Sequence, residues 1–174
     1  MTKIILTLLI SINFTILIDG QVAIGKSAVT NSSVSLEFGN GNRGMILPWV
    51  TSSTGVTGAV NGTVIYDITD KKVKYLKSGS WFDLSVDATG IVDTSLQDGK
   101  IEKTTAKTVI GTNSATDATA GILVLSDTNK AMILPKVDSP HLNIINPASG
   151  MIVYDTKTKQ LAVFNGNVWS FWKP

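Results

Sequence analysis

The feature that most constrains the fold of this chain is an internal duplication. The segment Met-Ile-Leu-Pro at residues 45–48 recurs intact at residues 132–135, and residues 62–67 match residues 150–155 in composition and order. The first block aligns with an offset of 87 residues and the second with an offset of 88, so one residue was gained or lost between the blocks. Two copies are fewer than the three or so repeats that a solenoid needs. We therefore expect two tandem β modules or one pseudo-symmetric domain.

Within each copy the residue pattern predicts β-strands. Residues 33–38 alternate between polar and apolar side chains, as a half-buried strand requires. The second half of each copy has the pattern of a three-stranded antiparallel meander, with an Asn165-Gly166 hairpin turn in the second copy. The predicted strands are 63–67, 72–76 and 81–84 in the first copy and 151–155, 160–164 and 168–172 in the second. The fold class that follows is all-β, with two related antiparallel β-hairpin or meander modules.

The N-terminus has the pattern of an export signal. Lys3 precedes an apolar run over residues 4–18, and Gly20 is a small residue at the expected cleavage point. The run is shorter than the ~20 residues that a membrane-spanning helix needs. We therefore predict a soluble protein exported through the Sec route to the periplasm, the cell surface or the medium, with no transmembrane span. The predicted division is a signal peptide at 1–20, a first β module at 21–85, a connector at 86–106 and a second β module at 107–174.

The motifs of the two copies resemble a module of exported proteins. A Gly-x-Ile-Val-Tyr-Asp-like strand at 150–155, followed by an apolar strand, Asn165-Gly166 and then Trp169, is similar to a module of uncharacterised β-repeat proteins of Bacteroidota. In that family the module often follows a Met-Ile-Leu-Pro-like strand and a loop containing Asn-Pro, here Asn146-Pro147. The resemblance covers nearly all of the predicted mature chain. Because the module recurs in surface and fibre-like proteins, it implies an exported β protein and supplies no catalytic residue.

Composition argues against several classes of function. The net charge is +2 with no basic cluster, which does not suit a nucleic-acid-binding protein. The chain has no cysteine and a single histidine, His141, so the common zinc sites and a Ser-His-Asp triad are not expected. Asp67 and Asp155 are equivalent residues at strand-to-turn junctions, where aspartate accepts hydrogen bonds from its own turn. We predict no catalytic, cofactor-binding or metal-binding residues, no cofactor and no enzymatic activity; an Asp-based glycoside hydrolase is the lowest-ranked alternative.

The aromatic residues divide into repeated and unrepeated ones. Repetition favours a core role, because each copy must fill the same space. The repeated pairs are Trp81 with Trp169 and Tyr66 with Tyr154. Trp49 and Trp172 have no aromatic counterpart in the other copy, so they are the candidates for contact with a partner or a glycan.

These observations support two hypotheses of function. The first is a non-enzymatic exported structural or adhesion protein of the cell envelope, which associates with itself or with envelope proteins through open β edges. The alternative is a carbohydrate-binding module that uses exposed tryptophan. Lysines crowd residues 71–77 of copy 1, while the equivalent strand of copy 2 carries Gln160 and Ala162. We therefore expect copy 2 to associate more readily than copy 1, with the other copy or with a neighbouring chain, and the strand at 160–164 is the candidate contact.

Overall fold

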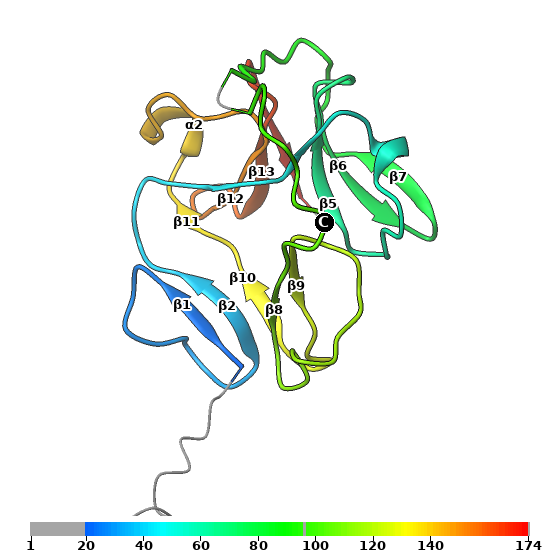
Figure 1. The fold of residues 1–174 in the computed structure, drawn as a ribbon. Helices are drawn as coiled ribbons and strands as arrows, with labels where there is room; N and C mark the ends of the chain where they lie inside the picture. The colour runs from blue at the N-terminus through cyan, green and yellow to red at the C-terminus, as the bar shows by residue number, and fades with distance from the viewer. Residues whose placement is uncertain (1–19, 96, 174) are drawn as a thin grey trace, which may run out of the picture.

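The computed structural model describes residues 20–95 and 97–173, so all of the predicted signal peptide except Gly20 lies outside the described residues. The described part is an all-β structure (Figure 1). Its elements are β1 (Val22–Ile24), β2 (Val34–Phe38), β3 (Met45–Ile46), β4 (Trp49–Val50), the 3-10 turn η1 (Ser53–Gly55), β5 (Val64–Asp67), β6 (Lys72–Lys77), β7 (Ser80–Asp83), β8 (Thr108–Ile110), β9 (Leu123–Leu125), β10 (Ala131–Ile133), β11 (Lys136–Val137), the short helix α2 (Pro140–Asn143), β12 (Met151–Asp155), β13 (Gln160–Phe164) and β14 (Trp169–Trp172). The strands β1 to β7 belong to copy 1, and β8 to β14 are their counterparts in copy 2.

The two predicted meanders are confirmed. Strands β5, β6 and β7 pair in antiparallel order, and β12, β13 and β14 do the same. Strands β12 and β13 begin and end at the predicted residues. Pro48 and Pro135, which cannot donate a ladder hydrogen bond, lie just before β4 and β11 and separate them from the strands that precede.

The chain also contains parallel pairs that the sequence analysis did not predict. Strand β1 is parallel to β2, β4 to β5, β8 to β9 and β11 to β12. In each pair the connecting loop returns along the first strand, so that the second strand starts beside the beginning of the first and runs in the same direction. Over the described residues the chain forms a β-solenoid of about eight turns rather than separate hairpin modules. The expectation that two copies are too few for a solenoid is wrong, because one copy of the sequence repeat holds several turns.

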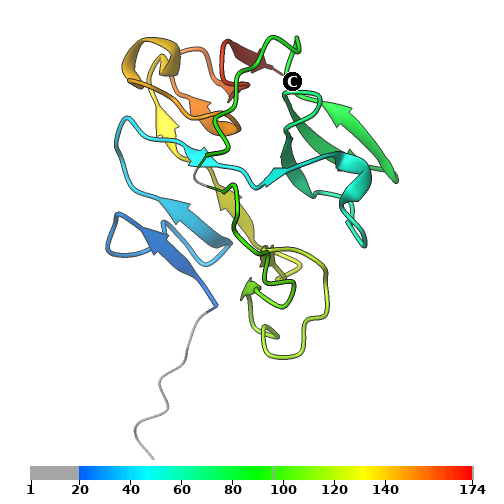
Figure 2. The same cartoon turned by 45° about the horizontal axis from the view of Figure 1, so that its top comes forward.

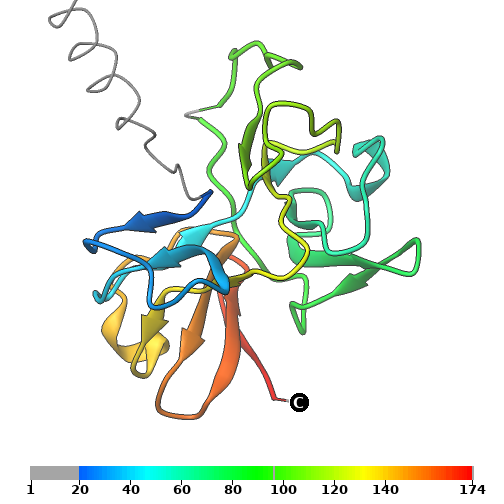
Figure 3. The ribbon, with the colours of Figure 1, turned by 90° about the horizontal axis from the view of Figure 1, so that it is seen from below.

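The copies are interleaved in space. Strand β10 of copy 2 lies parallel to β2 of copy 1, with Met132 opposite Leu36. Strand β3 of copy 1 lies antiparallel to β12 of copy 2, with Ile46 opposite Met151. Figures 2 and 3 show the blue strands of copy 1 beside the yellow and orange strands of copy 2 and away from the green strands of copy 1. The prediction of two separate modules is therefore corrected, since strands of both copies share sheets.

Strand β2 is buried on both faces, which corrects the prediction of a half-buried strand. Its polar residues Ser35 and Glu37 are only 0% and 3% exposed. The reason is that β2 lies between β1 and β10, and the β1–β2 loop folds over its polar face. Glu37 accepts hydrogen bonds from Lys26 Nζ at 2.7 Å and from Thr30 N at 2.6 Å. These donors, of which Lys26 has the largest effect, hold the pKa of Glu37 at about 2.

Acid should destabilise the fold through this carboxylate. The folded pKa of Glu37 is about 2 against an ordinary value of 4.5, so its contribution to stability is present above pH 4.5 and is lost as the pH falls toward 2. Asp67 and Asp155 also have lowered pKa values and act in the same direction. We expect the melting temperature, followed by circular dichroism, to decrease steeply below pH 4.5. The variant Glu37→Gln should show a shallower decrease, and an unchanged acid slope in that variant would contradict the assignment.

The predicted edge strand is not an edge. Strand β13 lies between β12 and β14, and β6 lies between β5 and β7. Ala162 is fully buried, and the lysine at its counterpart position, Lys74, is itself buried in an ion pair with Asp67 at 3.2 Å. The idea that residues 160–164 offer an open edge is therefore wrong, because two short turns place this strand at the centre of its meander.

Candidate association surface

The two copies share one hydrophobic core. Leu47, Tyr66 and Val73 of copy 1 pack against Ile152 and Val163 of copy 2. All five side chains are at most 5% exposed. A second core lies within copy 2 and is formed by Val137, Ile144, Met151, Val153, Ala162 and Phe164. Because the first core needs side chains from both copies, their contact is part of the folded structure.

Hydrogen bonds fix the orientation of this contact. The Tyr66 hydroxyl donates to the backbone oxygen of Asn165 at 2.7 Å, and Trp49 Nε1 donates to the backbone oxygen of Ser149 at 2.8 Å. From the other side, Trp172 Nε1 donates to the backbone oxygen of Leu84. All three donors are aromatic side chains that contribute apolar area and also satisfy a backbone acceptor.

The structure places the two candidate contact residues at different parts of this interface. Trp49 is half-buried between the copies, and its ring centroid lies 6.4 Å from that of Tyr66. Trp172 is 42% exposed at the end of β14. The hydrogen bonds of both side chains run between the copies.

The repeated aromatics do not share one environment. Tyr66 is fully buried, whereas its counterpart Tyr154 is 36% exposed, so the predicted core role is wrong for Tyr154. Trp81 and Trp169 are both half-buried, and the ring of Trp169 lies 5.2 Å from that of Phe164 against the core of copy 2.

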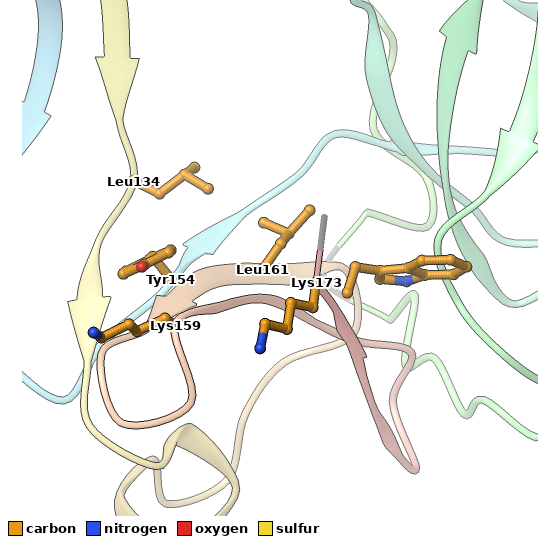
Figure 4. A pocket seen from close by; sticks show the side chains of 6 residues that line it. Leu134, Tyr154, Lys159, Leu161 and Lys173 are labelled. Carbon is orange, nitrogen blue, oxygen red and sulfur yellow. The ribbon is translucent and has the colours of Figure 1, made fainter.

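An open groove lies on copy 2 beside Trp172. It has a volume of about 550 Å³ and is lined by Leu134, Tyr154, Lys159, Leu161, Trp172 and Lys173 (Figure 4). We call it the copy 2 groove. Its apolar surface comes from the segment after β10 and from strands β12, β13 and β14. Leu134 and Leu161 were not predicted from the sequence, although the duplication offset aligns them with Leu47 and Val73 and is a signal that could have found them.

The equivalent aspartates serve local structure. Asp155 accepts hydrogen bonds from the backbone nitrogens of Lys157 and Thr158, and Asp67 accepts one from Asp70 N, which confirms the turn role predicted for them. Burial alone would raise the pKa of each carboxyl, but these hydrogen bonds outweigh it, so both pKa values are lowered. Both side chains are fully buried and already occupied by donors.

The remaining chemical candidates are few. His141 is exposed and packs edge-on against Phe171 with a ring-centroid distance of 5.6 Å. Within residues 20–95 and 97–173, no three His, Asp or Glu side chains are grouped closely enough to hold a metal ion. No helix in the described part of the chain has the length and apolar character needed to cross a membrane.

Comparison with known proteins gives one finding. Residues 109–173 match the family described as phage tail like trimerisation region. The match runs from β8 to β14 and so spans one copy of the repeat, including the residues of the copy 2 groove. No curated protein and no solved structure matches the chain. The second copy of this chain is therefore similar to a phage tail like trimerisation region.

Proposed function

We propose that this chain is a non-enzymatic, exported structural protein that assembles into a fibre-like trimer. The observation that carries the proposal is the match of one entire copy to a trimerisation region. The all-β, solenoid-like winding suits a fibre, because its strands leave edges at which another chain can continue the sheet.

Open surfaces of the described residues support self-association. Strand β9 pairs only with β8, and β10 pairs only with β2, so each has one edge without a strand partner in the described part of the chain. The copy 2 groove adds apolar side chains next to β10, since its Leu134 directly follows that strand. Unpaired backbone groups and exposed apolar area both favour association with another chain.

Export and adhesion belong to the same proposal. Export to the periplasm, the cell surface or the medium rests on the signal-like segment at residues 1–20. An adhesion role rests on the resemblance to surface proteins. The buried state of Asp67 and Asp155 does not favour the hydrolase alternative, because their carboxylates are turned into the fold.

The exposed face of Trp172 favours one alternative function, the binding of carbohydrate. Tryptophan beside a groove is a surface on which a sugar ring can stack. Screening the chain on a glycan array would test it. Binding that is lost in Trp172→Ala supports this function, and the absence of binding to every glycan on the array contradicts it.

Sedimentation equilibrium of the exported chain tests the main proposal. We expect a mass three times that of the monomer, because the family match is to a trimerisation region. Glycerol-gradient or mass-photometry measurements at decreasing concentration should show the same species. A chain that remains monomeric at high concentration would reject the trimer.

A further inference from the structure

We propose that the copy 2 groove binds copy 1 of a second chain, in the geometry with which copy 1 already binds copy 2 inside one chain. This inference rests on the proposed self-association and adds which two surfaces meet. The contact is head-to-tail: each chain offers its copy 2 groove to the next chain, and it receives the groove of another chain on partly exposed residues of copy 1. Such an interface closes into a ring when its rotation permits.

The first argument is the difference in burial between equivalent residues. In copy 1, the face that receives copy 2 is formed by Leu47, Tyr66 and Val73, which are 5%, 0% and 0% exposed. The copy 2 groove has the same face, formed by Leu134, Tyr154 and Leu161, all at least partly exposed. Leu134 and Leu161 pack against the shared core, while Tyr154 stays 36% exposed, so the groove repeats the occupied face but is only partly covered within the chain.

The residues of copy 2 that cover the copy 1 face indicate which residues of copy 1 can cover the copy 2 groove. A row of cross-strand neighbours on copy 2, Ile152, Val163 and Ser170, is at most 5% exposed. Their counterparts on copy 1 are Val64, Tyr75 and Phe82.

The row on copy 1 is less fully covered, although Val64 packs against the shared core. Val64 lies opposite Tyr75, and Tyr75 lies opposite Phe82 on the next strand, so the three side chains form one row on the sheet. Val64 and Tyr75 are half-buried and Phe82 is 44% exposed. The rings of Tyr75 and Phe82 lie 5.6 Å apart and present a continuous aromatic surface. This row is the surface that the copy 2 groove of another chain can bury.

The strand edges point to the same pairing. Inside the chain, Ile46 of β3 faces Met151 of β12, and Leu47 N donates to Gly150 O at 3.0 Å. The equivalent pairing would join Ile133 of one chain to Thr63 of another. Among the described residues, no strand pairs with the outer edge of β10 or with Thr63 on the β4 side of the sheet.

Disulfide trapping tests the pairing directly, because the chain has no cysteine of its own. Opposed residues of an antiparallel pair have Cα atoms about 4.5–5.5 Å apart, which suits a disulfide. The single variants Thr63→Cys and Ile133→Cys are refolded together and oxidised. We expect a covalent heterodimer in the mixture that neither variant forms alone. The matched control is a double variant, Ile46→Cys with Met151→Cys, which should close a disulfide within one chain and keep the monomer mass.

The outcomes separate this inference from the proposed function. A wild-type trimer whose cysteine mixture gives no heterodimer would overturn the inference and leave self-association intact. Equal cross-linking of one variant with itself would indicate a symmetric contact and also overturn it. A monomeric wild type would reject the proposed function itself.

An independent variant tests the face on copy 1. Tyr75→Glu places a charge in the exposed row without disturbing a fully buried residue. We expect the association to weaken roughly tenfold or more, while the circular dichroism spectrum of the chain stays unchanged. Unchanged association of a folded Tyr75→Glu chain would count against the pairing.

Discussion

Replacing Tyr66 by alanine should lower the free energy of unfolding by about 4 kcal/mol, as large-to-small changes of buried aromatics do. Tyr66 is 0% exposed and lies in the core that joins the two copies. The substitution removes the ring that packs against Trp49 and also leaves the backbone oxygen of Asn165 without its hydroxyl donor. Urea unfolding of the chain at a concentration at which it is monomeric measures this loss.

The repeat supplies a matched control for this prediction. Tyr154 occupies the equivalent position in copy 2 but is 36% exposed and lines the copy 2 groove. Tyr154→Ala should therefore cost less than about 1.5 kcal/mol in the monomer, because much of the ring is already in water. It should instead weaken association in sedimentation experiments. Equal losses of stability at the two positions would mean that the copies have equivalent environments, contrary to the structure.

The sequence predicted the local parts of the fold well. Both meanders follow from apolar strands separated by short turns such as Asn165-Gly166, and the residues that decide them are close in the chain. The turn role of Asp155 follows from the same local chemistry, since its donors at Lys157 and Thr158 are two and three residues away.

The pairing between copies could not be predicted in this way. The duplicated sequence gives β3 two equivalent choices, the β5 strand of its own copy and the β12 strand of the other, and residue pattern does not distinguish them. The structure pairs β3 with β12 and leaves β5 with β4 and β6. The double-sided burial of β2 has the same origin, because it depends on a neighbour, β10, that is distant in the sequence.

Only part of the candidate association surface could be predicted from the sequence. Trp49 and Trp172 were identified because they break the repeat, and both lie at or beside the contact between copies. Tyr154, another groove residue, was assigned to the core because repetition was taken to mean equal burial. The two copies contact each other through residues that are not equivalent, so equivalent residues such as Tyr66 and Tyr154 differ in exposure.

Removing the carboxylate of Asp67 should be nearly as costly as removing the ring of Tyr66. The Asp67 side chain is buried, accepts a hydrogen bond from Ser53 N at 2.8 Å and forms an ion pair at 3.2 Å with Lys74, which is also buried. Breaking a buried pair by deleting one partner leaves an uncompensated charge. We therefore expect Asp67→Ala to lower the free energy of unfolding by about 3 kcal/mol, measured by urea unfolding at pH 7.

Two further variants separate the charge of this network from its hydrogen bonds. Asp70 also pairs with Lys74, but its side chain is 51% exposed, so Asp70→Ala should cost less than about 1 kcal/mol. Lys74→Ala reproduces the residue of copy 2, where Ala162 takes the equivalent position and Asp155 accepts hydrogen bonds from Ser139 N, Lys157 N and the Thr158 hydroxyl. That variant should therefore lose less stability than Asp67→Ala, because the aspartate keeps its backbone donors while no buried ammonium is left without a partner. If Lys74→Ala instead proved the more damaging substitution, the ion pair rather than the turn hydrogen bonds would be the main stabilising contact of Asp67.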